Sequence, residues 1–295
     1  MKKSIKIFVL IGLFFLLQGR AVQAEKISIA VDQTIFSFNA NPDSTNEIKF
    51  KIKNLSSEMQ NIAVVPEDFV AGDNNSILNT TEKNEQFGMK DWISSPEKNY
   101  ALEPKETREI SLLISVPKNA TVGAHYAIAN IQAIPQVDGQ NFQNTIVGGQ
   151  IGVYILLNVN GDVSGSGNLN QFKAPIIANK DVSLKADFEN TGNILYIPHG
   201  EIQIDNVLTH KKTTVEMEKH FVFPGTKYSF ESTWNAPSVL GVYKAQANFI
   251  DADGNNHSQR RWIFGKLSFL VPLLLLAIIN SIFVIRKKVR KKKQK

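Results

Sequence analysis

The stretch "LEPKETREISLLISVPKNATVG", residues 102–123, decides the fold because it combines strand alternation with turn residues at both ends. Between Ile110 and Val116 apolar side chains recur at every second position, which turns one face of a strand toward a core. Pro104 and Pro117 flank this run, and proline lacks the amide donor that a further ladder bond would need. The stretch therefore predicts a half-buried antiparallel strand of a two-sheet sandwich.

A second copy of the pattern follows at residues 223–249, "FPGTKYSFESTWNAPSVLGVYKAQANF". Pro224 and Pro237 are thirteen residues apart, as are Pro104 and Pro117. Both copies continue through a short turn and a glycine into an aromatic strand. The correspondence indicates an internal repeat whose unit is a whole domain.

A second match lies upstream of each copy and in the same order. "KIKNLSSEMQNIAV" resembles "ADFENTGNILYIP", since each is a strand that ends in Asn, a small polar turn and another strand. Asn54 lies 50 residues before Pro104, whereas Asn190 lies 34 residues before Pro224. The first copy therefore carries an insertion, at about residues 68–100.

The rest of the exported part is also a series of short runs rich in Ile, Val, Phe and Tyr, separated by Asn, Gly, Asp and Pro. We predict an all-β fold of two tandem immunoglobulin-like β-sandwiches followed by one C-terminal transmembrane helix. The sandwiches are expected at residues 25–160 and 169–264. The Gly- and Ser-rich residues 161–168 are the expected linker.

The first 24 residues have the form of a secretory signal peptide. Lysines precede an apolar run, and small residues lead to a cleavage site after Ala24. The alternative is an N-terminal membrane anchor, but the apolar run is short for a span.

Near the other end, 19 uncharged residues run from Leu267 to Ile285, long enough for one membrane-spanning helix. The tail that follows, residues 286–295, has eight basic residues in ten and begins with Arg286, Lys287 and Lys288. The positive-inside rule places such a tail in the cytoplasm. We therefore expect a single-pass protein of the cell membrane with its N-terminal part outside the cell.

The formal net charge of +6 is a property of the two ends. With the four basic residues of the signal peptide and the eight of the tail set aside, 21 basic residues remain against 27 acidic ones. The exported part is thus acidic, which argues against a nucleic-acid partner. Cysteine is absent, so disulfides and thiolate metal sites are excluded.

Catalytic and cofactor motifs are missing from the sequence. The five histidines have no zinc-site spacing, and neither a G-x-S-x-G elbow nor a phosphate-binding loop is present. The run "DADGNN" at residues 251–256 resembles a calcium loop, but Asp-Gly between two strands favours a hairpin turn. We predict no enzyme activity, no metal and no cofactor.

Four aromatic residues of the insertion are the binding candidates, namely Phe69, Phe87, Trp92 and Tyr100. Loops on a rigid scaffold commonly carry recognition, and aromatic faces suit sugar rings and protein interfaces. The alternative is that Trp92 caps the sandwich core and that the insertion is ordered packing.

The motifs "ALEPKETREISLLISVPKNATVGAHYAIANI", "GGQIGVYILLNVNGDV", "FENTGNILYIPHGEI" and "FPGTKYSFESTW", with the signal peptide, membrane span and basic tail, resemble the WxL-interacting proteins of Gram-positive bacteria. The resemblance covers nearly the whole chain. It implies a peptidoglycan-binding first domain and a second domain that binds partner or host proteins, beside secreted WxL proteins. It implies no catalytic residues.

The expected function is a membrane-anchored surface protein that binds peptidoglycan, secreted surface proteins, or both. The alternative is a chaperone-like envelope assembly factor that presents a sheet edge to exported subunits. The first half is faintly similar to a pilus-chaperone sandwich, in its Asn-ended strand and its "VPKNA" turn. A long unprotected edge strand would favour that alternative.

Overall fold

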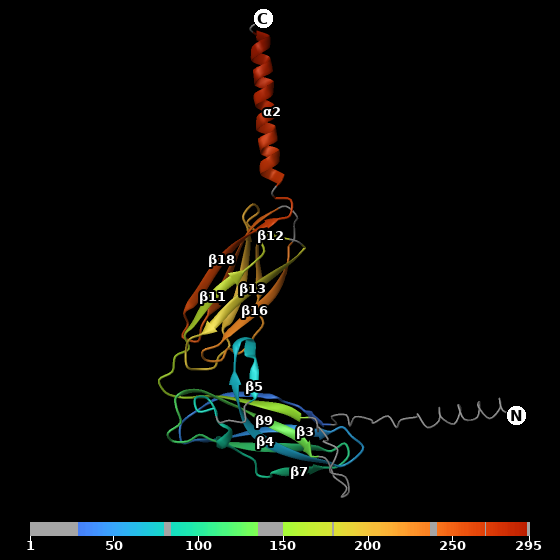
Figure 1. Ribbon diagram of the computed structural model, residues 1–295, viewed down its shortest axis with the longest axis vertical. Helices are drawn as coiled ribbons and strands as arrows, with labels where there is room; N and C mark the ends of the chain where they lie inside the picture. The colour runs from blue at the N-terminus through green and yellow to red at the C-terminus, as the bar shows by residue number, and fades with distance from the viewer. Residues whose placement is uncertain are drawn as a thin grey trace, which may run out of the picture.

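The computed structural model describes residues 29–79, 84–134, 150–178, 180–236, 241–268 and 270–293. Within these residues the chain is all-β, apart from two short 3-10 helices and one C-terminal α-helix. The strands form four sheets, which pack as two pairs with one hydrophobic core inside each pair. Figure 1 shows the pairs as two layered bodies, one following the other, which we call the first unit (residues 29–159) and the second unit (residues 167–265).

The first unit holds two sheets. One has the order β1-β3-β8-β6; the other has the order β2-β10-β9-β4, with β5 and β7 both paired to β4. The bounds are β1 (Ile29–Val31), β2 (Ile35–Ala40), β3 (Thr45–Asn54), β4 (Gln60–Ala71), β5 (Ile77–Asn79), β6 (Ile93–Ser94), β7 (Asn99–Leu102), β8 (Thr107–Ser115), β9 (Gly123–Ile134) and β10 (Gln150–Val159).

The second unit has the sheets β11-β13-β16 and β12-β18-β17-β14-β15. The bounds are β11 (Gly167–Lys173), β12 (Ile177–Ala178), β13 (Asp181–Asn190), β14 (His199–Asn206), β15 (Lys212–Glu216), β16 (Lys227–Asn235), β17 (Val242–Ile250) and β18 (Asn256–Gly265).

The two units share one strand order. The row β1-β3-β8 corresponds to β11-β13-β16, and β2-β10-β9-β4 corresponds to β12-β18-β17-β14. In both units the second sheet opens with a parallel pair, β2 with β10 and β12 with β18, while the other described pairs are antiparallel. The repeat read from the prolines is therefore also a repeat of topology.

A buried asparagine fixes the same corner in each unit. Asn54 ends β3 and is fully buried. Its Nδ2 donates to the backbone carbonyls of Glu58 (2.7 Å), Leu102 (3.1 Å) and Glu103 (3.0 Å), and its Oδ1 accepts the amide of Ser56 (2.9 Å). One side chain thus bonds four backbone groups and ties the end of β3 to the turn after it and to the end of β7.

Asn190, at the end of β13, repeats these bonds in the second unit and is equally buried. Its Nδ2 donates to the carbonyls of Ile194 and Val222, both at 2.8 Å, and its Oδ1 accepts the amide of Gly192 at 2.9 Å. Ile194 and Gly192 lie four and two residues after the asparagine, as Glu58 and Ser56 do in the first unit. Val222 lies two residues before Pro224, as Leu102 does before Pro104. The Asn-ended strand in the sequence was therefore a structural signal.

The proline turns are equivalent as well. The Glu106 amide bonds the Glu103 carbonyl across Pro104, and the Thr226 amide bonds the Phe223 carbonyl across Pro224, each at 3.1 Å. The residue after each proline has a positive φ, 65° at Lys105 and 72° at Gly225. Both turns have the φ pattern of a type II turn, and each leads into the strand expected after it, β8 or β16.

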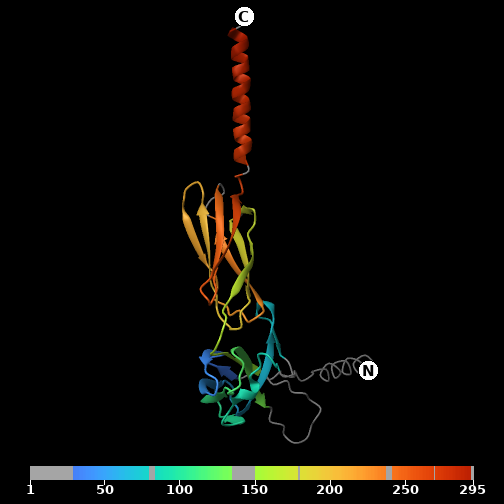
Figure 2. The same cartoon turned by 90° about the vertical axis from the view of Figure 1, so that its left-hand side faces the viewer.

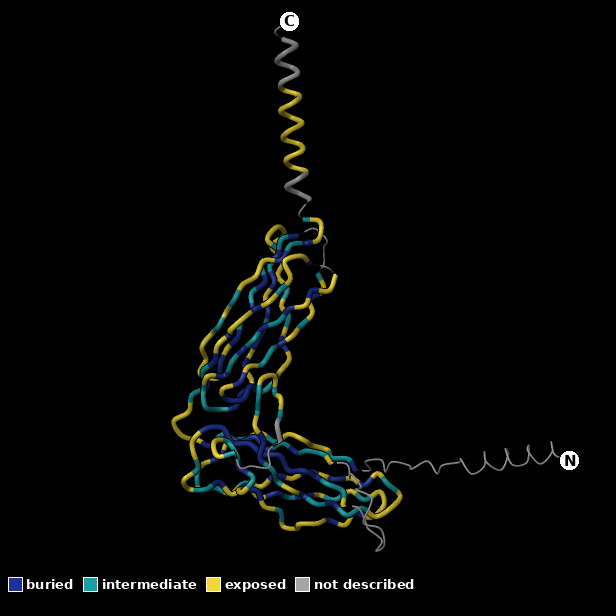
Figure 3. The backbone as a smooth tube through the Cα atoms, viewed as in Figure 1, coloured by how far each residue is buried: buried dark blue, intermediate teal, exposed yellow. Residues whose placement is uncertain are grey.

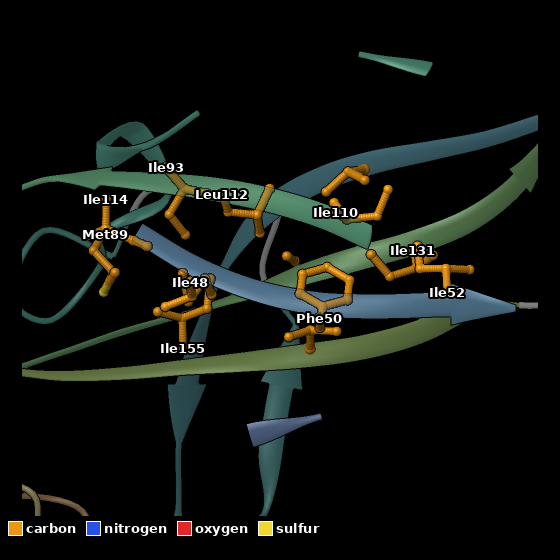
Figure 4. Close-up of a cluster of buried hydrophobic side chains, with 14 of the residues drawn as sticks. Ile48, Phe50, Ile52, Met89, Ile93, Ile110, Leu112, Ile114, Ile131 and Ile155 are labelled. Carbon is orange, nitrogen blue, oxygen red and sulfur yellow. The ribbon is translucent and has the colours of Figure 1, made fainter. Parts of the chain in front are cut away.

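The cores lie between the paired sheets. Figure 4 shows Ile48, Phe50 and Ile52 of β3 meeting Ile131 and Ile155 of the opposite sheet. From β8 the residues Ile110, Leu112 and Ile114 point into this cluster with no exposed surface, while Leu113 faces out at 37% exposure. Figure 3 shows the same buried interior running along the second unit. The expected alternation of the opening stretch is confirmed.

The insertion at about residues 68–100 is largely part of the sheets. Its first residues extend β4, which turns back as β5, and its last part forms β6 and β7. β6 pairs with β8 through Ile93 and Ser94, so the insertion also covers an edge of its own unit. The sequence predicted a polar connection here. Strands as short as β5, β6 and β7 show no clear alternation of apolar and polar residues, so they could not be recognised.

The domain boundaries stay predictions, but the expected linker, residues 161–168, is tied to the second unit. The Ser164 amide bonds Asn193 Oδ1 and the Gly165 amide bonds Asp253 Oδ1, both at 2.8 Å. Gly167 already belongs to β11.

The C-terminal helix α2 (Leu270–Lys293) follows the second unit, as Figure 1 shows. Among the described residues, no helix is both long enough and apolar enough to span a membrane. The signal peptide and its cleavage site after Ala24 lie outside the described residues, as do the side chains of Lys287 and Lys288.

Candidate binding surfaces

The four aromatic candidates lie in three different environments. Phe69 is fully buried and Tyr100 is 3% exposed, so neither ring offers a face to a ligand. Tyr100 belongs to the core of the first unit, where its hydroxyl bonds Ser95. Phe87 is half-buried and stacks on Tyr126 with ring centres 5.4 Å apart.

Trp92 is half-buried and packs against the first core and the ring of His125, whose centre is 4.5 Å away. Its placement agrees with the alternative in which Trp92 caps the sandwich. Burial lowers the pKa of His125, although its bond to the Thr121 carbonyl opposes the shift. A neutral histidine therefore sits here at physiological pH, as part of the packing.

Phe69 and Phe87 of the insertion help to build a junction between the units. We call it the junction cluster; its buried members are Phe69, Ala124, Tyr126, Ile128, Leu156, Leu195 and Phe223. Phe223 comes from the second unit and stands edge-on to Tyr126 and to Phe69, with ring centres 5.0 Å and 6.0 Å apart. Burial raises the pKa of Tyr126 to about 12.

Polar bonds fix the same junction. Asn158 Nδ2 donates to the Leu195 carbonyl and Asn158 Oδ1 accepts the Leu195 amide, both at 2.9 Å. The Ala124 amide donates to the Asn193 carbonyl at 2.8 Å. Gly123, with φ 108°, lies so close to Asn193 that a Cβ would be 2.4 Å from that carbonyl oxygen, so the approach requires glycine.

Asp68 holds the insertion in shape. Its carboxylate is buried, and Oδ1 accepts the amides of Met89 (2.9 Å) and Lys90 (2.8 Å) while Oδ2 accepts the amide of Asn84 (3.3 Å). These bonds satisfy backbone groups that no strand partner reaches. The segment that carries Phe87 is therefore fixed to β4.

The tip of the β4–β5 hairpin reaches the second unit. It forms the 3-10 helix η1 (Asp73–Asn75). Asp73 Oδ1 accepts the Lys227 amide and Asn74 Oδ1 accepts the Ser229 amide, both at 2.9 Å. Since β16 is an edge strand, these side chains take the place of a neighbouring strand along its first residues. Figures 1 and 2 both show the hairpin bridging the two units.

A cavity of about 490 Å³ opens where the tip meets the second unit. Its lining is polar and comes from both units: Asp73, Asn74, Asn170, Gln171, Asp187, Lys227, Ser229, Gln259 and Arg261. Two carboxylates and two cationic side chains balance in charge, and amides supply both donors and acceptors. This chemistry suits a neutral or zwitterionic ligand rich in hydroxyl and amide groups.

A second hollow, about 360 Å³, lies on the outer face of the five-stranded sheet. It is lined by His199, Glu201, Gln203, Gln246, Asn248, Ile250 and Asn256. The described residues contain no cluster of three or more His, Cys, Asp or Glu that could hold a metal ion. The run at residues 251–256 is the predicted hairpin turn, in which Asp251 accepts the amides of Asn255 and Gly167.

Asp73 and Asn74, which bond the second unit, are not among the four candidates that the sequence predicts. Their signal is weak, because "DNN" in a polar stretch predicts a turn without saying what the turn touches. The sequence of β9 indicates more clearly that this strand is covered on both faces. Its first nine residues are all buried, so both of its faces are covered, and "AHYAIANI" is almost continuously apolar or aromatic.

Residues 21–132 match the family model described as "WxL Interacting Protein, peptidoglycan binding domain". The match includes the η1 tip and ends within β9. No curated protein matches the chain. Among solved structures, the class 5 fimbriae chaperone CfaA is 9% identical, covers 80% of this chain and 98% of its own, and has a TM-score of 0.42.

The E. coli chaperone DraB is 11% identical over 81% of this chain and 97% of its own, with a TM-score of 0.36. A PapD-like domain of human CEP192 covers 49% of this chain and 95% of its own at 10% identity, with a TM-score of 0.32. These structural likenesses are too distant to bear on function. The match over residues 21–132 identifies this part of the chain as a domain of the kind found in WxL-interacting proteins and supports a place in that family.

Proposed function

We propose that the protein is a non-catalytic scaffold of the cell surface that binds peptidoglycan and holds a secreted WxL-type protein near the membrane. The observation that carries the proposal is the match of residues 21–132 to a peptidoglycan binding domain. The units are immunoglobulin-like sandwiches in tandem, a reading supported by their common strand order. Host proteins are a further partner class for the second unit.

The residues from Leu267 to Ile285 anchor the protein as one transmembrane helix. Support comes from the uncharged run, of which residues 270–285 lie in α2, and from the basic residues that follow it. The exported part then lies outside the cell, and the tail from Arg286 onward lies in the cytoplasm. Protease added to cells stripped of their wall should digest the exported part. Cleavage of an epitope fused after Lys295 on intact cells would contradict this orientation.

The 490 Å³ cavity is the proposed contact for a peptidoglycan fragment. Peptidoglycan presents hydroxyl, acetamido and peptide groups, which require donors and acceptors at close spacing. Gln171, Asn74 and Arg261 supply both around the cavity. Within this lining, the residues of the hairpin tip are the ones that belong to the peptidoglycan binding domain. The proposed ligand therefore contacts the protein where the two units pack together.

Sedimentation with purified insoluble peptidoglycan tests the cavity. The full chain in detergent is compared with the double variant Gln171→Ala/Arg261→Ala. We expect about a tenfold loss of affinity, since two polar contacts of roughly 0.7 kcal/mol each would be removed. The control is Gln203→Ala/Gln246→Ala in the second hollow, which should bind as the parent does. Reversal of these two results would move the site to the second hollow.

One observation favours the chaperone-like alternative. β16 pairs with β13 on one side, and the hairpin tip covers the other side only at Lys227 and Ser229. Residues 231–235 have no strand partner on that side among the described strands. Such an edge can accept an extended segment of another protein. Proline at Thr233 would block strand addition and leave peptidoglycan binding intact.

A further inference from the structure

Large apolar side chains gather on the surface at one end of the second unit. Most exposed are Leu208 (69%), Ile176 (66%) and Trp262 (52%), and Ile177, Val207 and Leu267 join them. We call these six residues the apolar collar. Single exposed apolar residues are normal on protein surfaces, but six at one end call for a partner.

Three connections place the collar at the end of the unit from which α2 departs. The Phe264 amide near the end of β18 donates to the Ile176 carbonyl, at 2.7 Å. The Val207 amide donates to the Val242 carbonyl at the start of β17, at 2.8 Å. Leu208 lies in the turn after β14, and Figure 1 shows the nearby β12 beside the base of the helix.

The connection to α2 is short and held by hydrogen bonds. Ser268 Oγ accepts the Gly241 amide (3.0 Å) and donates to the Gly241 carbonyl (2.8 Å), while the Gly265 amide donates to the same carbonyl (2.8 Å). α2 begins at Leu270, two residues after Ser268. A membrane that surrounds α2 therefore comes within reach of this end of the unit.

Lysines outnumber acidic residues at this end. Five lysines lie on the segments that carry the collar, at positions 180, 211, 212, 244 and 266, against the two aspartates Asp181 and Asp205. Anionic lipid headgroups attract basic residues, and tryptophan prefers the boundary between headgroups and acyl chains.

We propose that the collar rests on the outer leaflet of the membrane, with its apolar side chains at headgroup depth and the lysines against anionic phosphates. This inference rests on the proposed anchoring through α2. The contact would hold the second unit upright and, through the junction cluster, set the height of the peptidoglycan-binding unit above the membrane. An interfacial apolar surface next to basic residues is the usual chemistry of such contacts.

The absence of cysteine makes the test direct. Single cysteines are introduced at Leu208, at Val163 and at Leu276 in the full chain, and each is labelled with an environment-sensitive fluorophore. Val163 is a matched control, since it is exposed and apolar but lies at the far end. The labelled chains are reconstituted in phosphatidylethanolamine–phosphatidylglycerol vesicles with or without brominated acyl chains. Bromine quenches only at close range.

We expect the Leu208→Cys and Leu276→Cys labels to lose about half of their fluorescence and the Val163→Cys label to lose almost none. Quenching at Leu276 without quenching at Leu208 would overturn the inference and keep the anchor. Absence of quenching at both would remove the anchor as well. Equal quenching at Leu208 and Val163 would show a unit lying flat on the membrane, which also contradicts the proposal. An Ile176→Cys label should repeat the Leu208 result.

Discussion

The two units share the corner formed by a buried asparagine and a proline turn, but the residue before the proline has a different environment in each unit. In the first unit, Glu103 precedes the turn proline and faces solvent, while in the second unit Phe223 holds the equivalent position and is buried in the junction cluster. The edge strands differ in the same way. β8 is covered by β6 of its own unit, whereas β16 is covered at its start by the hairpin tip of the other unit.

The difference shows what the insertion does. One domain plan occurs twice, and the extra residues of the first copy supply an edge cover, a hairpin and several aromatic side chains. These features connect the units. An isolated second unit would leave Phe223 and the start of β16 uncovered. Aromatic residues of the insertion pack at this junction, and they are therefore not exposed as a binding surface.

The buried asparagines test whether the corners are equivalent. Asn54→Ala removes three donated bonds and the acceptor of the Ser56 amide, and we expect it to destabilise the protein by roughly 4 kcal/mol because four bonds of about 1 kcal/mol each are lost. Asn190→Ala should cost nearly as much, roughly 3 kcal/mol, with two donated bonds lost. Urea unfolding of the full chain in detergent measures both. A cost under 1 kcal/mol at either position would contradict the equivalence.

The junction is tested by giving the second unit the residue of the first. Phe223→Glu should weaken the inter-unit contact by about 3 kcal/mol, since a buried aromatic ring is replaced by a carboxylate. Spin labels at Val65→Cys and Ile250→Cys should then report a broadened distance distribution. Glu103→Phe is the matched control, and it should leave the distribution narrow. A narrow distribution for both would show that the polar bonds alone hold the junction.

Much of this architecture is predictable from the sequence because it depends on local rules. The proline turns, the Asn-ended strands and the alternation of β8 all follow from donors, φ preferences and pleat geometry. Phe69 and Tyr100 could not be placed in this way. Whether an aromatic side chain faces solvent, a core or another unit depends on contacts distant in sequence. The family match and the shared strand order support the general plan, while the binding residues stay a proposal.

A feature of the second unit without a described counterpart in the first is Asp251. Burial raises the pKa of its carboxyl, but bonds donated by His257, Asn255 and Gly167 outweigh burial and hold the pKa below 3.8. The carboxylate therefore stabilises the folded state above pH 3.8, and this contribution is lost as the pH falls through the lowered pKa.

Asp251→Asn should destabilise the second unit by about 2 kcal/mol at neutral pH, because a charged acceptor of several bonds is replaced. The difference between parent and variant should shrink in strong acid. Thermal unfolding between neutral and acidic pH measures it. A difference that stays constant with pH would mean that shape, and not charge, is what the site requires. Asp253→Asn, at a more exposed position of the same turn, is the control.

The smallest effect concerns the residue after each proline. Lys105 and Gly225 both adopt positive φ, a region that glycine enters freely and other residues resist. A Cβ at Gly225 would meet no atom within 4 Å, so the cost of Gly225→Lys is conformational, about 1 kcal/mol. Lys105→Gly should stabilise the first unit by less than this, because Lys105 Nζ also donates to the Leu55 carbonyl. Opposite shifts of the two melting temperatures would confirm that the turns are equivalent. Shifts in the same direction would show that the hydrogen bond of Lys105 to the Leu55 carbonyl outweighs the cost of its positive φ, and that the two turns are stabilised differently.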